Sequence, residues 1–271
     1  MDRNPQLQQM ADESMIRNLE AQATCIWPQE EPLLDRYQLP ADARILDVGC
    51  GTGEISARLA ARYPAAQVTG VDLLDSSLRY ARQRHGERGG RLRFEQGDAF
   101  ALAFDDGAFD LVVCRHVIQA VPHPEQILAQ LVRVCRPGGW VHVLAEDYGM
   151  VHFPPGEHDV DRLWREGLMP FCDDTQTDAR VGRRVWGLLR QLGLQQLRVD
   201  YVVVDTERAP REAFAEIFRA WRDGYAETLQ ARGRLPPDTA RPMFDQAIRT
   251  ILDPAQYAVW HVPILGGRKP G

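Results

Sequence analysis

The sequence predicts an α/β protein in which a mostly parallel sheet of seven strands carries helices on both faces and a mainly helical cap. Short runs of apolar and β-branched residues recur along the chain, and segments with helical periodicity lie between them. Such an alternation of strands and helices gives a parallel sheet that is covered on both faces. Two long insertions that interrupt the alternation are expected to form the cap.

The first five strands are expected at runs that are rich in β-branched residues. These are residues 44–48, 67–71, 92–95, 109–114 and 140–145. Amphipathic helices are expected between them, such as 54–63, where Ile55, Leu59 and Tyr63 share one face, and 125–136. After the first insertion the pattern predicts one helix and two more strands, at residues 181–192, 197–204 and 258–265.

The 271 residues exceed the usual size of a domain, so a single elaborated domain and a core domain with a small appended cap are the alternatives, and the single domain is favoured. We divide it into core and cap segments. They are an N-terminal helical lid (1–40), the core (41–147), a cap insertion (148–180), more core (181–206), a helical insertion (207–255) and the final core strand (256–271). The second insertion has an apolar stripe of Phe214, Ile217, Phe218 and Trp221, which is interpreted as packing.

Composition favours a small molecule as the partner. The net charge is −6 and the arginines are scattered among acids, so no basic stripe predicts binding to nucleic acid. No apolar run reaches the ~18 residues of a membrane span, and the first residues lack an apolar core. A cytoplasmic location is therefore expected, and a homodimer is compatible with the sequence.

The five cysteines are expected to be reduced, unreactive thiols. Their number is odd, they are widely spread, and none forms a CxxC pair, which disfavours both structural disulfides and a zinc site. A free cysteine in an apolar stretch is usually a small buried hydrophobe. No metal is expected in this protein.

The most informative stretch is ILDVGCGTGEIS, residues 45–56. An apolar strand ends near Asp47, Gly49, Gly51 and Gly53 follow, and a helix begins behind them. Glycine is needed where the backbone turns sharply or a ligand approaches it closely, and a helix start offers free N–H groups. This is predicted to be a ligand-binding turn.

The spacing within this turn indicates which ligand it binds. A dinucleotide fingerprint GxGxxG/A needs a small third residue, and that position is Glu54 here. The GxGxG pattern after Asp47 resembles instead the first motif of the class I S-adenosylmethionine-dependent methyltransferases, of the small-molecule, UbiE-like kind. The resemblance spans residues 45–143 and implies a Rossmann-like sheet that binds S-adenosylmethionine and releases S-adenosylhomocysteine.

The resemblance also implies a set of cofactor-binding residues. Asp47 would organise the loop and face the amino group, Asp72 would bind the ribose hydroxyls, Leu73 would pack on the adenine, and Asp98 with Ala99 would bind the adenine edge. Each acid also has a structural interpretation as a helix cap. The full expected set is Asp47, Gly49, Cys50, Gly51, Gly53, Asp72, Leu73, Asp98, Ala99, Arg115 and His116.

The candidate catalytic residues are His116, Tyr148 and His152. They follow the fourth and fifth strands, and the carboxyl edge of an open α/β sheet is where ligands bind. A base is needed if the acceptor is a hydroxyl or a protonated amine, although positioning alone is enough for some methyl transfers. Each of the three also has a structural interpretation, as a wall, packing or surface residue.

One departure from the family concerns the loop after the fourth strand. Many relatives have a histidine pair before its proline, and this chain has Gln119 and Ala120 there, with His123 after Pro122. This removes a familiar candidate base. Glu146 and Asp147 end the fifth strand and are candidates either to bind an amine or to hold the insertion.

The predicted function is methyl transfer from S-adenosylmethionine to an O or N atom of a small molecule, either a specialised metabolite or a quinone-like compound. The expected lid would enclose the acceptor, and aromatic side chains in it are candidates for the pocket wall. They are Trp27, Phe153, Trp164 and Phe171. An NAD(P)-dependent oxidoreductase and a non-catalytic cofactor-binding subunit are the alternatives.

Overall fold

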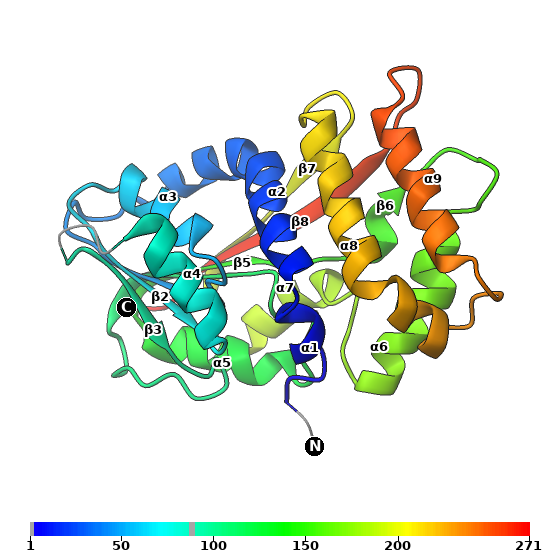
Figure 1. The fold of residues 1–271 in the computed structure, drawn as a ribbon. Coiled ribbons are helices and arrows are strands. Elements are labelled where there is room, and N and C mark those ends of the chain that lie inside the picture. Colours follow the sequence, from blue (N-terminus) through cyan, green and yellow to red (C-terminus); the bar gives the residue numbers. More distant parts are fainter. Residues whose placement is uncertain (1–2, 87–89) are drawn as a thin grey trace.

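A computed structural model describes residues 3–86 and 90–271 of the chain (Figure 1). Its centre is an eight-stranded sheet in the order β3-β2-β1-β4-β5-β8-β6, with β7 pairing β8 outside this path. Five of the strands run parallel to one another. They are β1 Arg44–Val48, β2 Gln67–Asp72, β3 Leu92–Gln96, β4 Phe109–Arg115 and β5 Cys135–Leu144. The predicted α/β class and the mostly parallel sheet are thus confirmed.

The last three strands are antiparallel to their partners. β8 (Val259–Arg268) pairs with β5 through residues 264–268 and with β6 (Val151–His152) through residues 259–260. β7 (Gln195–Asp205) pairs along β8 as well. The sheet has eight strands where seven were expected, because the first insertion contributes the two-residue strand β6, which is too short to leave a pattern in the sequence.

Helices cover both faces of the sheet, as expected. On one face, α5 (Pro124–Val134) and α7 (Gly182–Gln191) pack their apolar sides on β1, β4 and β5. On the other face lie α3 (Glu54–Arg62), α4 (Asp75–His85) and the short η1 (Glu31–Tyr37). The helix α2 (Glu13–Glu30) lies in the segment expected to be a helical lid and contains Pro28.

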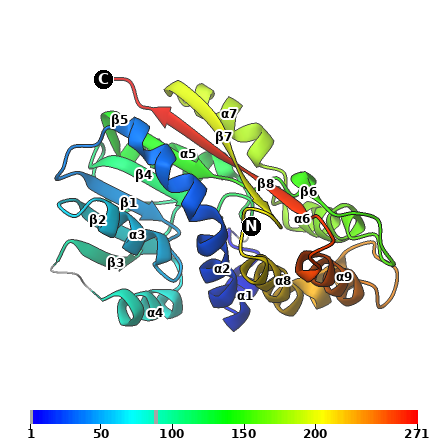
Figure 2. The same ribbon diagram turned by 90° about the horizontal axis from the view of Figure 1, so that it is seen from above.

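A mainly helical layer lies beside the sheet, beyond the carboxyl ends of the parallel strands (Figure 2). Most of it packs around a core rich in aromatic residues, to which α2, β7 and β8 also contribute. Its elements are α1 Leu7–Met10, η2 Tyr148–Met150, η3 Leu163–Leu168, α6 Met169–Thr175, α8 Arg211–Arg232 and α9 Ala240–Leu252. Arg17 of α2 joins the N-terminal segment to α8 through ion pairs with Glu216 at 2.6 Å and Asp223 at 3.0 Å.

Two expectations about side chains can be compared with this core. Phe214, Ile217 and Phe218 of the α8 stripe are fully buried, as expected for packing, while Trp221 also borders a pocket described below. All five cysteines are unpaired and buried. Within residues 3–86 and 90–271, no helix is long and apolar enough to span a bilayer.

Candidate active site

A pocket lies at the carboxyl ends of β1, β2 and β4, beneath α1 and α2. We call it the glycine-loop pocket, and its empty volume is about 820 Å³. Residues at or just beyond the ends of β1, β2, β3 and β4 line it, and residues of the N-terminal helices cover it. Its walls include Leu7, Met10, Leu19, Gly49, Gly51, Asp72, Leu73, Leu74, Asp98, Ala99, Phe100, Arg115, His116 and Val117.

The glycine loop has a backbone that only glycine adopts without strain. Gly49, Gly51 and Gly53 have φ angles of 73°, 50° and 78°. A Cβ atom on Gly49 would lie 2.2 Å from Cγ2 of Val117, so the loop also has no room for a side chain. The backbone N–H groups of Gly49 and Cys50 donate to the carbonyl of Val71 at 2.7 and 3.0 Å, which ties the loop to β2.

Asp47 organises the start of α3. Its carboxylate is buried and accepts a hydrogen bond from the Ser56 hydroxyl at 2.7 Å. Burial raises the pKa of Asp47 to about 6, although the Ser56 hydrogen bond and the nearby Arg115 guanidinium favour the charged form. The carboxylate lies at a small hollow that also contacts Gly49 and Arg115, so it borders the space next to the loop.

Asp72 both braces the glycine loop and borders the pocket. Its Oδ2 atom accepts a hydrogen bond from the Gly51 N–H at 2.8 Å, and its Oδ1 atom accepts one from the Leu74 N–H at 2.9 Å. Burial raises the pKa of this carboxyl group. Leu73 is exposed and lies on the pocket wall, as a side chain that covers a flat ring would.

Asp98 and Ala99 follow β3 on the opposite wall. The Asp98 carboxylate accepts a hydrogen bond from the Phe100 N–H at 2.9 Å, which fixes the turn after the strand. Both residues line the glycine-loop pocket. Asp98 therefore both stabilises the turn after β3 and lies on the pocket wall.

Arg115, at the end of β4, belongs to a buried chain of polar groups. Its guanidinium lies 2.8 Å from Glu30 of α2, whose other oxygen lies 2.9 Å from His142 Nε2. The ring of His142 reaches the Tyr37 hydroxyl through Nδ1 at 2.7 Å. Burial alone would raise the pKa of Glu30, but Arg115 and His142 lower it to about 2. Sequence reasoning missed Glu30, since it lies in a helix with no motif.

His116 lies at the junction of two pockets. It lines the glycine-loop pocket and also a second pocket on the other side. Its φ angle is 57°, an uncommon backbone conformation for a residue with a side chain. Nδ1 makes a short hydrogen bond with the buried carboxylate of Glu146, and Nε2 is buried with no partner among the described residues. The free nitrogen is thus available to a bound molecule.

The second pocket is mainly apolar, and we call it the aromatic pocket. It has an empty volume of about 680 Å³ and shares Gln6, Met10, Leu19, His116 and Ala120 with the glycine-loop pocket. Its other walls come from α2, the loop after β4, the first insertion, α8 and α9. They are Met15, Asn18, Gln22, Gln119, Glu146, Tyr148, Trp164, Leu168, Cys172, Ala179, Trp221, Tyr225, Leu229 and Phe244.

The structure brings Tyr148 to this pocket but not His152. The Tyr148 ring stacks on Trp164, with centroids 5.5 Å apart. His152 is exposed on β6 and lines neither pocket, because alternate residues of a strand point to opposite sides and Val151 takes the buried one. The expectation that His152 approaches the acceptor is therefore corrected.

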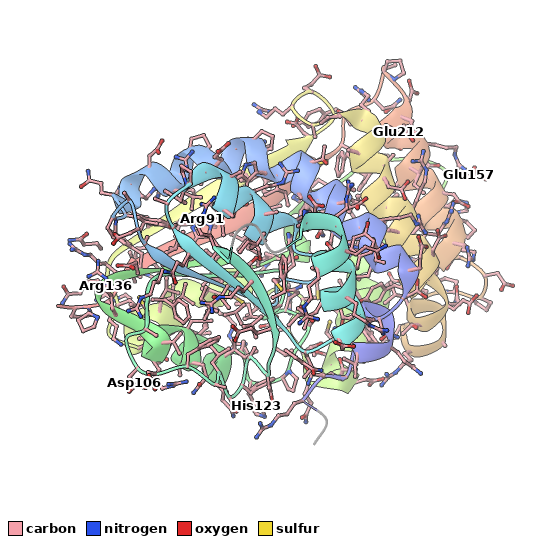
Figure 3. All side chains as sticks on the ribbon, turned by 60° about the vertical axis from the view of Figure 1, so that its left-hand side comes forward. Arg91, Asp106, His123, Arg136, Glu157 and Glu212 are labelled. Carbon is pink, nitrogen blue, oxygen red and sulfur yellow. The ribbon has the colours of Figure 1, made fainter. Side chains whose placement is uncertain are left out.

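The expected aromatic wall is also corrected in part. Trp164 lines the aromatic pocket, whereas Trp27, Phe153 and Phe171 do not. Trp27 packs with η1 and α3, and the other two pack within the helical layer. His123 stands at the periphery, where it contacts Glu125 at 3.2 Å (Figure 3). Sequence reasoning missed Trp221, Tyr225 and Phe244, because stripes at helical spacing are the same for packing and for a pocket wall.

The glycine-loop pocket fits S-adenosylmethionine by two observations on its walls. Gly49 and Gly51 border the pocket without side chains, and the Asp72 carboxylate stands at the end of β2. Among residues 3–86 and 90–271 there is no group of three or more His, Cys, Asp or Glu side chains placed to hold a metal ion.

Comparison with known proteins agrees with this geometry. Residues 45–139 match the family model of the methyltransferase domain. The solved structure of a Haemonchus contortus phosphoethanolamine N-methyltransferase, bound to phosphomonomethylethanolamine and S-adenosylhomocysteine, superposes with a TM-score of 0.63 at 20% identity. The likeness covers 98% of this chain and 59% of that one. The comparisons thus support a methyltransferase domain over residues 45–139, in a fold that is shared with the solved methyltransferase structure.

Two curated relatives are similar in the sheet region. A ubiquinone biosynthesis O-methyltransferase of Leptothrix cholodnii is 34% identical over 158 residues, which are 52% of this chain and 66% of that protein. A demethylmenaquinone methyltransferase of Thermus thermophilus is 37% identical over 135 residues, 48% of this chain and 58% of that protein. The chain thus spans less than two thirds of the length of these relatives.

Proposed function

We propose that this protein transfers a methyl group from S-adenosylmethionine to an oxygen or nitrogen atom of a small molecule held in the aromatic pocket. The observation that carries this proposal is the meeting of the two pockets at His116, which lines both. A cofactor in the first pocket and an acceptor in the second would face each other at that point. In-line displacement needs this alignment more than any other contribution from the enzyme.

The cofactor site is proposed for the residues that line the glycine-loop pocket or shape its loop. Asp72 would bind the ribose hydroxyls with the lone pairs that its two backbone hydrogen bonds leave free. Leu73 and Ala99 would contact the adenine, with Asp98 at its edge. Bound S-adenosylmethionine supplies a methyl group on a positively charged sulfur.

The chain's own part in the reaction is to position the two molecules and to exclude water. Met10 of α1 and Leu19 of α2 lie on the wall that both pockets share, so the N-terminal helices enclose the meeting point. A closed, apolar surrounding keeps water from competing with the acceptor. We propose on this basis that residues 1–40, 148–180 and 207–255 act as the cap of a core formed by 41–147, 181–206 and 256–271.

A quinone-like compound or a specialised metabolite is proposed as the acceptor. The relative from L. cholodnii is named a ubiquinone biosynthesis O-methyltransferase and that from T. thermophilus a demethylmenaquinone methyltransferase. The aromatic pocket suits a flat ring. His116 and Tyr148 are the proposed catalytic residues, since both line this pocket. A cytoplasmic location and a homodimer stay predictions.

Isothermal titration calorimetry with S-adenosylmethionine, S-adenosylhomocysteine and NADH tests the donor side. We expect both S-adenosyl compounds to bind and NADH not to bind, and we expect Asp72→Ala to weaken S-adenosylhomocysteine binding at least tenfold. Asp75→Ala, an exposed acid on the helix that follows, is the matched control. NADH binding without S-adenosylhomocysteine binding would indicate an oxidoreductase, and cofactor binding with no methyl transfer to any compound would indicate a non-catalytic subunit.

A further inference from the structure

We propose that the aromatic pocket selects an uncharged acceptor with a hydroxyl group, and that His116, held by Glu146, takes the proton of that hydroxyl. The inference rests on the proposed function and adds to it the charge of the acceptor and the path of its proton. Three features of the pocket carry it: its unpaired polar atoms, its charge and the geometry at His116.

The aromatic pocket contains buried polar atoms that have no partner within the described residues. Six belong to residues on its walls, and a native interior leaves few such atoms unpaired unless a ligand or water meets them. They are Asn18 Oδ1, Gln22 Oε1, His116 Nε2, Gln119 Oε1, Glu146 Oε2 and Trp164 Nε1. Most are oxygens that accept hydrogen bonds. A ligand that satisfies them must bring donors, and hydroxyl groups are the uncharged donors that fit.

The charge of the pocket walls disfavours an anion. Among the described residues that line the aromatic pocket, none is lysine or arginine, and the one carboxylate is Glu146, which is 1% exposed. A phosphate or carboxylate in this space would have no lysine or arginine on these walls to pair with and would meet a buried negative charge. The phosphate-bearing molecule seen in the H. contortus structure would therefore lack a counter-charge here.

The geometry at His116 gives the proton a destination. The ring is 7% exposed, its Nδ1 contacts the Glu146 carboxylate, and its Nε2 has no protein partner. A neutral imidazole that donates from Nδ1 to a carboxylate keeps a lone pair on Nε2. Glu146 thus fixes the tautomer and the ring orientation, and it stabilises the imidazolium that forms when Nε2 accepts a proton.

The step balances with these groups. The acceptor oxygen forms a bond to the methyl carbon as the bond between that carbon and sulfur breaks, and sulfur keeps the electron pair. The hydroxyl proton moves to Nε2 of His116. The products are a methyl ether, neutral S-adenosylhomocysteine and an imidazolium paired with Glu146. The imidazolium returns its proton to water after product release. His116 is the catalytic residue of this step, and Glu146 is a positioning residue.

The first test compares three naphthalenes that differ in charge: 2-naphthol, 2-naphthoate and protonated 2-(aminomethyl)naphthalene. Their binding to protein saturated with S-adenosylhomocysteine is measured by calorimetry. We expect 2-naphthol to bind at least tenfold more tightly than 2-naphthoate, and Glu146→Gln to narrow that ratio. Equal or tighter binding of the naphthoate, tighter binding of the amine, or no binding of the naphthol overturns the proposal.

The second test follows the proton. Transfer of labelled methyl groups to 2-naphthol is measured for wild type, His116→Asn and Glu146→Gln at about pH 7 and about pH 10, where aromatic hydroxyls ionise without a base. Asparagine suits the left-handed backbone of residue 116. Near pH 7 we expect His116→Asn to lower the rate at least 100-fold relative to wild type, and near pH 10 its rate should be within tenfold of the wild-type rate. The rate of Glu146→Gln should lie between those of wild type and His116→Asn.

The matched control is His152→Asn, the same change at an exposed histidine outside both pockets, which should stay within twofold at each pH. If His116→Asn lowers the rate by the same factor at both pH values, the residue has only a structural role. This result overturns the proposal that His116 is the base. So does an absence of transfer to 2-naphthol by wild type that binds both ligands. Loss of S-adenosylhomocysteine binding by wild type would instead contradict the proposed function itself.

Discussion

The two pockets that meet at His116 are built in different ways. The glycine-loop pocket is formed mainly by residues at the ends of adjacent strands, and its loop is braced by hydrogen bonds to the Asp72 carboxylate and to the Val71 carbonyl. The aromatic pocket is formed by side chains from segments that are distant along the chain, with several polar atoms left unpaired. The difference teaches that the pocket proposed for the cofactor depends on the order of adjacent strands, whereas the pocket proposed for the acceptor depends on how α2 and the insertions pack together.

The largest effect on stability is expected at Glu30, which joins α2 to the strands β4 and β5. Glu30→Ala removes the carboxylate that lies between Arg115 and His142 and leaves a buried guanidinium unpaired. We expect the free energy of unfolding to fall by about 3–5 kcal/mol, measured by urea denaturation near neutral pH. Arg165→Ala, which breaks the exposed pair with Asp159, should cost about 0–1 kcal/mol. Equal losses of unfolding free energy in the two variants would mean that the buried polar groups around Glu30 do not hold α2 to the sheet.

Gly49→Ala is the next largest, and it tests the glycine loop. The new Cβ would lie 2.2 Å from Val117, and the backbone has a φ of 73°, so we expect a loss of about 2–4 kcal/mol. Binding of S-adenosylhomocysteine should weaken at least tenfold. Gly193→Ala is the control, because its φ is 81° and no atom lies within 4 Å of the new Cβ. If both variants lose equal stability, backbone strain alone explains the glycine.

A smaller effect concerns pH and Asp47. Its pKa is raised by burial from 3.8 to about 6, so the folded state binds the proton more tightly than the unfolded state. This carboxyl therefore lowers stability as pH rises from about 4 to about 6, and the loss persists above that range. Asp47→Asn should remove this decline. The free energy of unfolding of the variant, relative to wild type, should therefore rise by about 1–3 kcal/mol as the pH increases from 4 to 8. Thermal unfolding of both proteins at several pH values measures this difference. The same dependence of stability on pH in wild type and variant would contradict the prediction.

The smallest effect is expected for Tyr148→Phe, on the acceptor side. The structure gives the Tyr148 hydroxyl no hydrogen bond to another described residue, while the ring stacks on Trp164. We expect the free energy of unfolding to change by less than about 1 kcal/mol and S-adenosylhomocysteine affinity to stay within twofold. Methyl transfer should fall less than tenfold. A loss as large as that expected for His116→Asn would make Tyr148 the base instead.

Most of the sheet could be predicted from the sequence, because each strand leaves a local pattern of apolar residues. The strand expected over 197–204 is β7, and that over 258–265 is β8. The helical lid expected over 1–40 contains the long helix α2, which continues through Pro28 to Glu30. β6 could not be predicted, because a two-residue strand exists only through its pairing with β8.

The cofactor residues could be proposed from the sequence for a physical reason. Parallel strands bring their carboxyl ends to one edge, so residues that follow β1, β2, β3 and β4 meet without any knowledge of the loops. Gly49 and Gly51 carry the positive φ angles that only glycine adopts freely. The sequence by itself therefore determined the fold class and the edge of the sheet where the cofactor is proposed to bind.

Only the tertiary structure decided the acceptor side. Whether an insertion residue reaches the pocket depends on how α8, η3 and β6 pack, and this excluded His152 while it brought in Trp221. The pairing of His116 with Glu146 joins the ends of two adjacent strands, at a residue whose positive φ angle has no pattern in the sequence. Side-chain direction and long-range packing carry no local pattern, and for this reason the sequence identified His116 without its partner.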